Sequence, residues 1–187
     1  MGPRLRPPNG QRGLRRRGAR VPRRTLPRRR PLIALLGDTH LPRGSRRLPD
    51  ACLRLLAKAD LVLHVGDFTA LSVLEELREL APVTAVRGNM DEPALRRALP
   101  ERAIVDAEGM RIGLVHDAGP AARRHARLAA AFAECDLVAY GHSHAPELAR
   151  VGEAWIVNPG SPTERRRAAW HTMAVVRAGA PELVRLD

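Results

Sequence analysis

Short apolar runs that each end at a polar residue constrain the fold of this chain more than any other feature. Leu32–Leu36 ends at Gly37-Asp38, and Leu61–Val65 ends at Gly66-Asp67. Such runs are typical of strands that are buried on both faces. From residue 31 onward they alternate with helical patterns, so the first part of the chain predicts parallel strands joined by helices.

Helical periodicity falls between these runs. Leu48–Ala59 has Pro49 placed for the first turn of a helix, where a missing N–H is tolerated. Leu71–Leu80 has the apolar spacing of an amphipathic helix. A third strand over Val83–Val86 and a short helix over Glu92–Leu99 complete this part of the prediction.

After Pro100 the pattern changes to hairpins. A helix over Ala121–Ala133 and a strand over Leu137–Tyr140 separate the first predicted hairpin from the other two. The paired strands are Arg102–Ala107 with Met110–Val115, Glu147–Arg150 with Ala154–Val157, and Thr172–Arg177 with Glu182–Leu186. Parallel units followed by hairpins predict an α/β fold, in which two mixed β-sheets pack as a sandwich with helices on the outer faces.

The net charge of +12 comes from one segment. Residues 1–30 hold twelve arginines and no acidic residue, so the remaining chain has 20 basic and 20 acidic residues and is neutral. We expect residues 1–30 to be a disordered Arg/Pro-rich tail and residues 31–187 to form one domain. We favour a passive extension over a nucleic-acid-binding arm or a targeting peptide, and the neutral domain makes nucleic acid an unlikely partner except through the tail.

No membrane or secretory segment is predicted. Leu32–Leu36, which follows the arginines, is too short for the apolar region of a signal peptide, and no run approaches the roughly 18 apolar residues of a membrane span. Cys52 and Cys135 lack CxxC spacing, which predicts buried packing residues in a reducing compartment. We therefore expect a soluble, cytoplasmic protein.

Polar side chains able to bind metal follow every apolar strand up to residue 140 except Arg102–Ala107. They are Asp38, His40, Asp67, Asn89, His116, His142 and His144. Because ligands gather beyond the carboxyl ends of strands in α/β sheets, these residues are expected to converge. Seven side chains are too many for one tetrahedral ion and suit two ions about 3.5–4 Å apart. Mixed imidazole, carboxylate and amide ligands favour Mn, Fe, Zn, Ni or Co over Mg or Ca.

Each of these residues alone has a simpler explanation. A Gly-Asp after a strand is often a turn or helix cap, Asn89 suits a left-handed turn, and a lone His116 is more often a satisfied polar residue. The most specific piece is His142-Ser143-His144, because alternating positions on an extended segment have little structural reason to be histidine twice. The joint arrangement favours metal binding.

Five segments together resemble the calcineurin-like metallophosphoesterase superfamily. They are GDTH at 37–40, GD at 66–67, GNMD at 88–91, His116 and GHSH at 141–144. The sequence is most similar to the small bacterial and archaeal phosphodiesterases, whose relatives include the retromer scaffold subunit of eukaryotes. The resemblance covers about residues 32–187, includes NPGS at 158–161, and implies the αββα fold of that superfamily.

The resemblance also implies a role for each matched position. One ion would be held by Asp38, His40 and His144, the other by Asn89, His116 and His142, and Asp67 would bridge the two. It implies attack on phosphorus by a hydroxide that bridges the ions, since metal coordination lowers the pKa of water from near 16 toward about 7. We expect manganese, with Ni, Zn, Fe or Co as alternatives, and we take Asp67, Asn89, His142 and Asp91 as the catalytic candidates.

Two positions depart from the family pattern. Met90 stands where many phosphomonoesterases and protein phosphatases of the superfamily have a histidine that is thought to protonate the leaving group. Loss of a general acid typically costs on the order of 10²–10⁴ in rate, which favours diesters with good leaving groups. Asp91 could replace that acid or could instead orient Asn89 or another ligand. Asp117, where glycine is more common, adds a carboxylate that could tune the second ion or face solvent.

Polar residues outside this set carry weaker predictions. His64 is expected to pack or to orient a ligand, and Arg87 is as consistent with a phosphate contact as with a solvated strand edge. Arg165–Arg167 follow the NPGS segment and could meet an anionic substrate, although we favour a solvated charge run. Asn158–Gly160 is expected to form a rigid turn.

Two functions from different classes remain. The first is a dinuclear-metal-dependent phosphodiesterase acting on a small phosphodiester or nucleotide, and the alternative is a metal-binding scaffold for protein interaction with little or no catalysis. All seven ligand positions hold competent residues, which a scaffold would be free to lose, so we favour the enzyme. A homo-oligomer is compatible with either.

Overall fold

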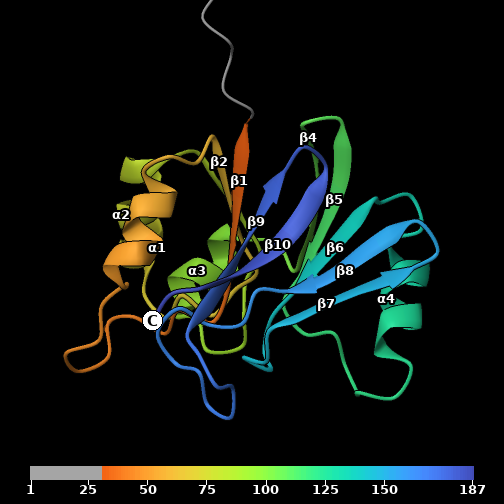
Figure 1. Cartoon of the computed structure of the whole chain (residues 1–187). Coiled ribbons are helices and arrows are strands. Elements are labelled where there is room, and N and C mark those ends of the chain that lie inside the picture. Colours follow the sequence, from red (N-terminus) through yellow and green to blue (C-terminus); the bar gives the residue numbers. More distant parts are fainter. Residues whose placement is uncertain (1–30) are drawn as a thin grey trace, which may run out of the picture.

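Two five-stranded mixed sheets carry the fold (Figure 1). The computed structural model describes residues 31–187, so the tail predicted over residues 1–30 lies outside the described residues. The first sheet contains β1 (Leu32–Leu36), β2 (Leu61–His64), β3 (Val83–Ala85), β9 (Thr172–Arg177) and β10 (Ala180–Arg185), in the order β10-β9-β1-β2-β3. The second contains β4 (Arg102–Ala107), β5 (Met110–Val115), β6 (Leu137–Tyr140), β7 (Glu147–Val151) and β8 (Ala154–Asn158), in the order β4-β5-β6-β8-β7.

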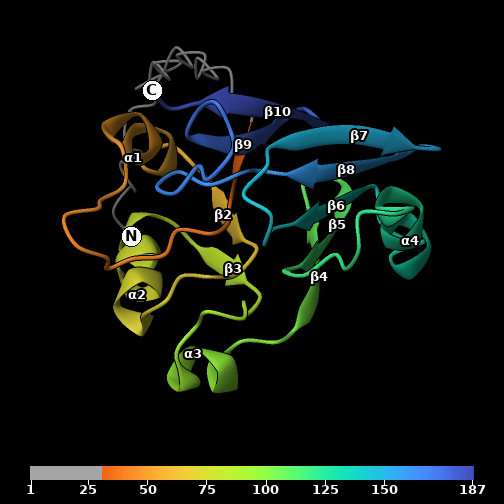
Figure 2. The same ribbon diagram turned by 90° about the horizontal axis from the view of Figure 1, so that it is seen from below.

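Helices cover the outer face of each sheet. α1 (Asp50–Leu56) and α2 (Leu71–Leu80) lie on the first sheet, α4 (Arg124–Ala131) lies on the second, and α3 (Pro93–Ala98) lies in the connection between β3 and β4 (Figures 1 and 2). This arrangement confirms the predicted sandwich. No helix within residues 31–187 combines the length and the hydropathy needed to cross a membrane.

The apolar run of β1 is buried on both faces because it lies between two cores. Ala34 and Leu36 pack with Cys52 and Leu77 beneath α1 and α2. Leu35 and its neighbour Ile33 face the second sheet, in a core that includes Ile112, Leu114 and Val157. A third core joins Leu128 and Phe132, at α4, to the outer face of the second sheet. Both cysteines are buried and free, as predicted.

The pairing of parallel strands brings their carboxyl ends to one edge. Leu36 of β1 pairs with His64 of β2, so the loops carrying Asp38 and Asp67 leave the first sheet together. In the second sheet Val115 pairs with Tyr140, so His116 and Gly141-His142 also leave side by side. Strand register alone therefore brings together loops that are far apart in the sequence.

Several predicted boundaries were wrong, and three of them have a clear cause in the backbone. Pro49 precedes α1 in an extended conformation, with φ −58° and ψ 147°, instead of occupying its first turn. α4 begins only after Arg123, because that residue adopts the left-handed conformation with φ 53°. β10 begins at Ala180, since Ala178 and Gly179 form a tight turn with positive φ that pairs Ala180 with Arg177 at once.

Candidate metal centre

The loops after β1, β2 and β6 hold five of the seven predicted ligands in the left-handed region. The φ angles are 53° for Asp38, 44° for His40, 60° for Asp67, 70° for His142 and 57° for His144. Residues other than glycine adopt such angles at a cost of roughly 1–3 kcal/mol each, and they persist where surrounding contacts hold them, commonly at ligand sites. The backbone therefore supports these positions as a functional centre.

Asp38, His40 and His144 form a buried group, which we call the first cluster. Their potential ligand atoms lie within 4.8 Å of one another. His144 Nε2 is 3.1 Å from His40 Nε2 and 3.5 Å from Asp38 Oδ1. His144 Nδ1 donates to the carbonyl of Glu164, which leaves a lone pair on Nε2 facing the Asp38 carboxylate. Two acceptors facing each other in a buried space fit a cation between them.

Asn89, His116 and His142 meet at the Asn89 amide, and we call them the second cluster. Asn89 Oδ1 is 3.0 Å from His116 Nε2 and 2.9 Å from His142 Nδ1. His116 Nδ1 donates to the carbonyl of Val65 over 2.7 Å, so its Nε2 is the atom available to a metal. Asn89 and His142 are exposed, whereas His116 is buried.

Asp67 lies between the two clusters. Its Oδ2 atom is 3.6 Å from His40 Nε2 and 3.4 Å from His116 Nε2, and its Oδ1 accepts the Met90 N–H over 2.8 Å. One carboxylate oxygen thus faces a histidine of each cluster, which is where a bridging ligand would lie. The close approach of Asp67 to the loop that carries Asn89 requires a glycine at position 88, because a Cβ there would lie 2.0 Å from Asp67 Oδ1.

The charges of the site also fit divalent ions. Burial raises the pKa of Asp38 to about 7, and its Oδ2 atom has no hydrogen-bond partner within the described part of the chain. Burial likewise lowers the pKa of His144 to about 4, which keeps its imidazole neutral and able to coordinate. For Asp67, burial opposes ionisation, but hydrogen bonds from His116 and Met90 hold the pKa below its usual value. Bound cations would stabilise both carboxylates in their charged form.

Asp91 binds the loop of the second cluster through both carboxylate oxygens. Oδ1 accepts the Thr69 N–H over 3.0 Å, and Oδ2 accepts the Gly88 N–H over 2.7 Å. The residue is only 3% exposed. Of the two roles considered from the sequence, this geometry favours orienting Asn89 over protonating a leaving group. Met90, by contrast, is 54% exposed.

His64 supports the Asp67 loop from inside the fold. Its Nδ1 accepts the Gly66 N–H over 3.1 Å, its Nε2 lies 3.3 Å from Thr39 Oγ1, and its ring stacks on Phe68. Burial lowers the pKa of His64 to about 3, so it packs as a neutral ring. This is the packed, orienting role expected from its place inside an apolar strand.

Sequence reasoning gave too little weight to the segment that follows β8. Asn158 was expected only to form a turn, but its Nδ2 donates to Gly141 O over 3.2 Å and to Ser143 Oγ over 2.9 Å. Ser161 Oγ donates to the Asp38 carbonyl over 2.7 Å. These bonds connect the Asp38 loop to the His142 loop. Asn158 could have been noticed, because it ends a buried strand as the predicted ligands do.

Arg166 departs from the solvated charge run expected over Arg165–Arg167. It turns back at φ 47°, and its Nη1 donates to the His142 carbonyl over 3.3 Å. Its guanidinium is close enough to lower the pKa of Asp38, His40 and His144, although burial is the larger influence on all three. A positive charge therefore lies beside the first cluster, and nothing in the local sequence indicates which of the three arginines supplies it.

Known proteins resemble this chain in sequence. The sequence profile of the calcineurin-like phosphoesterase superfamily domain matches residues 32–180. A probable metallophosphoesterase of Methanothermobacter thermautotrophicus is 31% identical over 163 residues, covering 80% of this chain and 94% of that protein. Another, from Methanocaldococcus jannaschii, is 35% identical over 138 residues, covering 72% and 70% respectively.

Among solved structures, Vps29 of Chaetomium thermophilum superimposes with a TM-score of 0.66 and 27% identity, covering 78% of each chain. The profile match extends from β1 into β10 and so includes both clusters and the NPGS segment. On this combined evidence the chain belongs to the calcineurin-like phosphoesterase superfamily.

Proposed function

We propose that the protein is a phosphodiesterase that depends on two divalent metal ions. The observation that carries the proposal is the position of Asp67, whose Oδ2 atom faces His40 of the first cluster and His116 of the second. One anionic group placed between two sets of neutral or anionic ligands suits a pair of cations, whose mutual repulsion it screens. The mixed nitrogen and oxygen donors favour manganese, with Ni, Zn, Fe or Co as alternatives.

The protein's own residues would prepare the site for phosphoryl transfer. Asp38, His40 and His144 would hold one ion, Asn89, His116 and His142 the other, and Asp67 both. When bound, the ions would activate a water molecule and neutralise charge on the phosphoryl oxygens. Backbone acceptors fix the ring orientation of His116 and His144, and Arg166 adds a positive charge beside the first cluster that would attract a phosphate.

Protonation of the leaving group is the step for which the site offers least support. Met90 carries no proton to donate, and both carboxylate oxygens of Asp91 already accept backbone N–H groups. Without a general acid, expulsion of a poor leaving group slows by roughly 10²–10⁴. We therefore propose that the substrate is a small diester or nucleotide whose leaving group departs as a stable anion.

One assay tests the proposal directly. Purified protein with Mn²⁺ should hydrolyse bis-p-nitrophenyl phosphate faster than p-nitrophenyl phosphate, and Asp67→Ala or His142→Ala should abolish turnover. Asp106→Ala and His125→Ala serve as matched controls, since each removes the same type of side chain outside the centre. Full activity in Asp67→Ala would refute the two-metal assignment.

A scaffold function is the alternative, and the likeness to Vps29 is the observation that favours it. Metal-loaded protein that hydrolysed no member of a broad phosphoester panel would support it over the enzyme. The complete set of metal-competent side chains in both clusters favours catalysis. A cytoplasmic location remains part of the proposal.

A further inference from the structure

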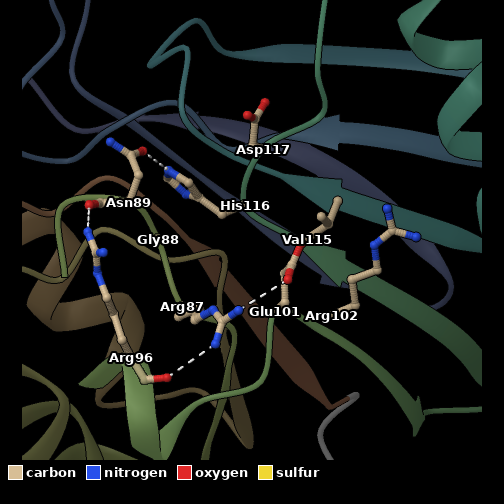
Figure 3. A pocket seen from close by; sticks show the side chains of 9 residues that line it. All are labelled: Arg87, Gly88, Asn89, Arg96, Glu101, Arg102, Val115, His116 and Asp117. Atoms are coloured by element: carbon tan, nitrogen blue, oxygen red, sulfur yellow. Dashed lines mark hydrogen bonds and ion pairs between the residues drawn. The ribbon is translucent and has the colours of Figure 1, made fainter. Parts of the chain in front are cut away.

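A cavity of about 530 Å³ opens directly beside the second cluster (Figure 3). Its lining includes Asn89 and His116 of that cluster and three arginines, Arg87, Arg96 and Arg102, together with two acidic residues, Glu101 and Asp117. We call it the arginine cavity. Because it shares two side chains with the second cluster, a substituent on a phosphorus held at the metal centre would enter it. A cavity in this position would contact the group bonded to that phosphorus.

Hydrogen bonds within the protein hold two of the three guanidinium groups of the cavity, those of Arg87 and Arg96. Arg87 donates to the Arg96 carbonyl over 3.3 Å and to Glu101 over 3.1 Å, and Figure 3 shows its guanidinium pointing toward both. Arg96 donates to the Asp91 carbonyl over 2.8 Å and to the Asn89 carbonyl. Arginines that are ordered before binding lose less conformational freedom when an anion arrives, which strengthens the interaction.

Arg102 is the arginine of this cavity whose guanidinium has no hydrogen-bond partner within residues 31–187. It begins β4, and its backbone pairs with Val115, the residue directly before His116. Its guanidinium lies 5.8 Å from the centre of the Phe132 ring, and within residues 31–187 it has no acidic partner. Arg87 is paired with Glu101, and Asp117 points away from Arg87 in Figure 3 while its Oδ1 accepts the Gly119 N–H. Three arginines against the carboxylates of Glu101 and Asp117 leave the lining with one positive charge in excess.

This charge and the missing general acid point to the same kind of leaving group. An alcohol that leaves without a proton donor departs as an alkoxide, whose conjugate acid has a pKa near that of water, about 16. A phosphate monoester is a far better anion, because its second pKa is only about 6. Guanidinium groups bind phosphate oxygens in a bidentate geometry and would stabilise the negative charge that such a leaving group gains.

We propose that the arginine cavity is the subsite for a leaving group that itself carries a phosphate, which makes the substrate a diester of pyrophosphate. A water oxygen forms the new bond to the scissile phosphorus, and the bond from that phosphorus to the bridging oxygen breaks. The electron pair of the broken bond leaves on the oxygen of the departing phosphate monoester beside Arg102, and the proton from water passes to solvent. The products are two phosphate monoesters. This inference rests on the proposed phosphodiesterase function and narrows its substrate class.

Steady-state kinetics with two substrates test the inference. With Mn²⁺, Arg102→Gln should lower kcat/KM for diadenosine 5′,5″-diphosphate by about tenfold or more, the loss expected for one charge-assisted hydrogen bond. Hydrolysis of bis-p-nitrophenyl phosphate, whose leaving group carries no phosphate, should change less than about twofold. Arg97→Gln is the matched control, because it removes the same charge from α3 outside the cavity. An equal loss on both substrates, or no loss on either, would overturn the assignment.

Binding of AMP, which is the leaving group of that substrate, gives a second measurement that needs no turnover. Calorimetric titration of the Mn²⁺-loaded protein should show AMP binding that Arg102→Gln weakens by about tenfold and Arg97→Gln leaves unchanged. If the protein hydrolyses neither diester yet binds AMP in this way, the proposed function fails while the subsite stands. If it hydrolyses bis-p-nitrophenyl phosphate but AMP affinity is the same in Arg102→Gln, the subsite fails while the function stands.

Discussion

The two clusters of the metal centre differ in how far they are closed to solvent. Asp38, His40 and His144 of the first cluster are at most 5% exposed, whereas Asn89 and His142 of the second lie at the surface. Ser161 of the NPGS segment bonds the Asp38 carbonyl of the first cluster, and the second cluster adjoins the arginine cavity. We infer that the first cluster holds its ion as a fixed part of the fold, while the second is where water and substrate enter.

Gly88→Ala should disturb both clusters, because it displaces Asp67, the proposed bridging ligand. A Cβ at this position would lie 2.0 Å from Asp67 Oδ1 and 2.3 Å from Asp67 N, so the backbone has to move. We expect kcat to fall by about 10³, because metal-ion catalysis depends on a fixed coordination geometry.

Gly152→Ala is the control for that variant. Its φ is 60° and its Cβ would meet nothing within 4 Å, so only backbone strain of about 1 kcal/mol is added. Its kcat should equal that of the wild type. Wild-type kinetics in Gly88→Ala would contradict the placement of Asp67.

Removing one histidine from each cluster tests whether the two ions are bound independently and with different strength. His144→Ala should lower the affinity for the first ion by more than about a hundredfold, since a ligand matters more than the surrounding residues that support it. It should also leave Asp38 buried without its histidine neighbour. His142→Ala should weaken only the second ion and leave the first at full occupancy. Elemental analysis after dialysis measures this, and equal loss of both ions from the two variants would refute a difference between the clusters.

Asn158→Ala tests whether the loop of His142 depends on its brace. The substitution removes the bonds from Nδ2 to Gly141 O and Ser143 Oγ while leaving every proposed ligand in place. Loss of such supporting contacts typically costs about 10–100-fold in metal affinity or activity. The Mn²⁺ dependence of bis-p-nitrophenyl phosphate hydrolysis should shift to higher concentration, with kcat recovered at saturation. An unchanged Mn²⁺ dependence would show that the brace does not act on metal binding.

Of these variants, His64→Gln should have the smallest effect, which is a change in how stability depends on pH. His64 lies beneath both clusters. Burial lowers the pKa of His64 to about 3 in the folded protein, so between pH 6.5 and 3 the unfolded chain takes up a proton that the folded chain does not. The stabilising effect of the neutral ring is therefore present above pH 6.5 and decreases as the pH falls through this range. Urea denaturation of metal-free protein should show a shallower loss of stability between pH 7 and 5 in His64→Gln. An identical slope would show that His64 titrates normally.

The sequence was sufficient to predict those parts of the site that depend on strand ends. Asp38, Asp67 and His116 follow buried strands, and parallel pairing places such ends together whatever the loops do. Asn158 and Arg166 were misjudged because their contacts depend on how the segment after β8 folds back across the molecule. No local periodicity encodes that approach.

The change from α/β units to hairpins was also predictable, because it depends on residues that are close together in the sequence. Hairpin turns depend on neighbouring residues, and β4, β5 and β9 have the predicted bounds, whereas β10 begins two residues before its predicted start. The arginine cavity was not predictable, because it forms only where α3 and the start of β4 meet the second cluster. The sequence identified the arginines as charged residues but did not indicate where they lie relative to a bound anion.

Anomalous diffraction at the manganese edge, from crystals of the Mn²⁺-loaded protein, tests the two-metal centre most directly. We predict two peaks about 3.5–4 Å apart, with Asp67 Oδ2 between them. The peak beside Asp38, His40 and His144 should have the higher occupancy, because that cluster is the more closed. A single peak, or a pair of peaks that does not flank Asp67, would contradict the account.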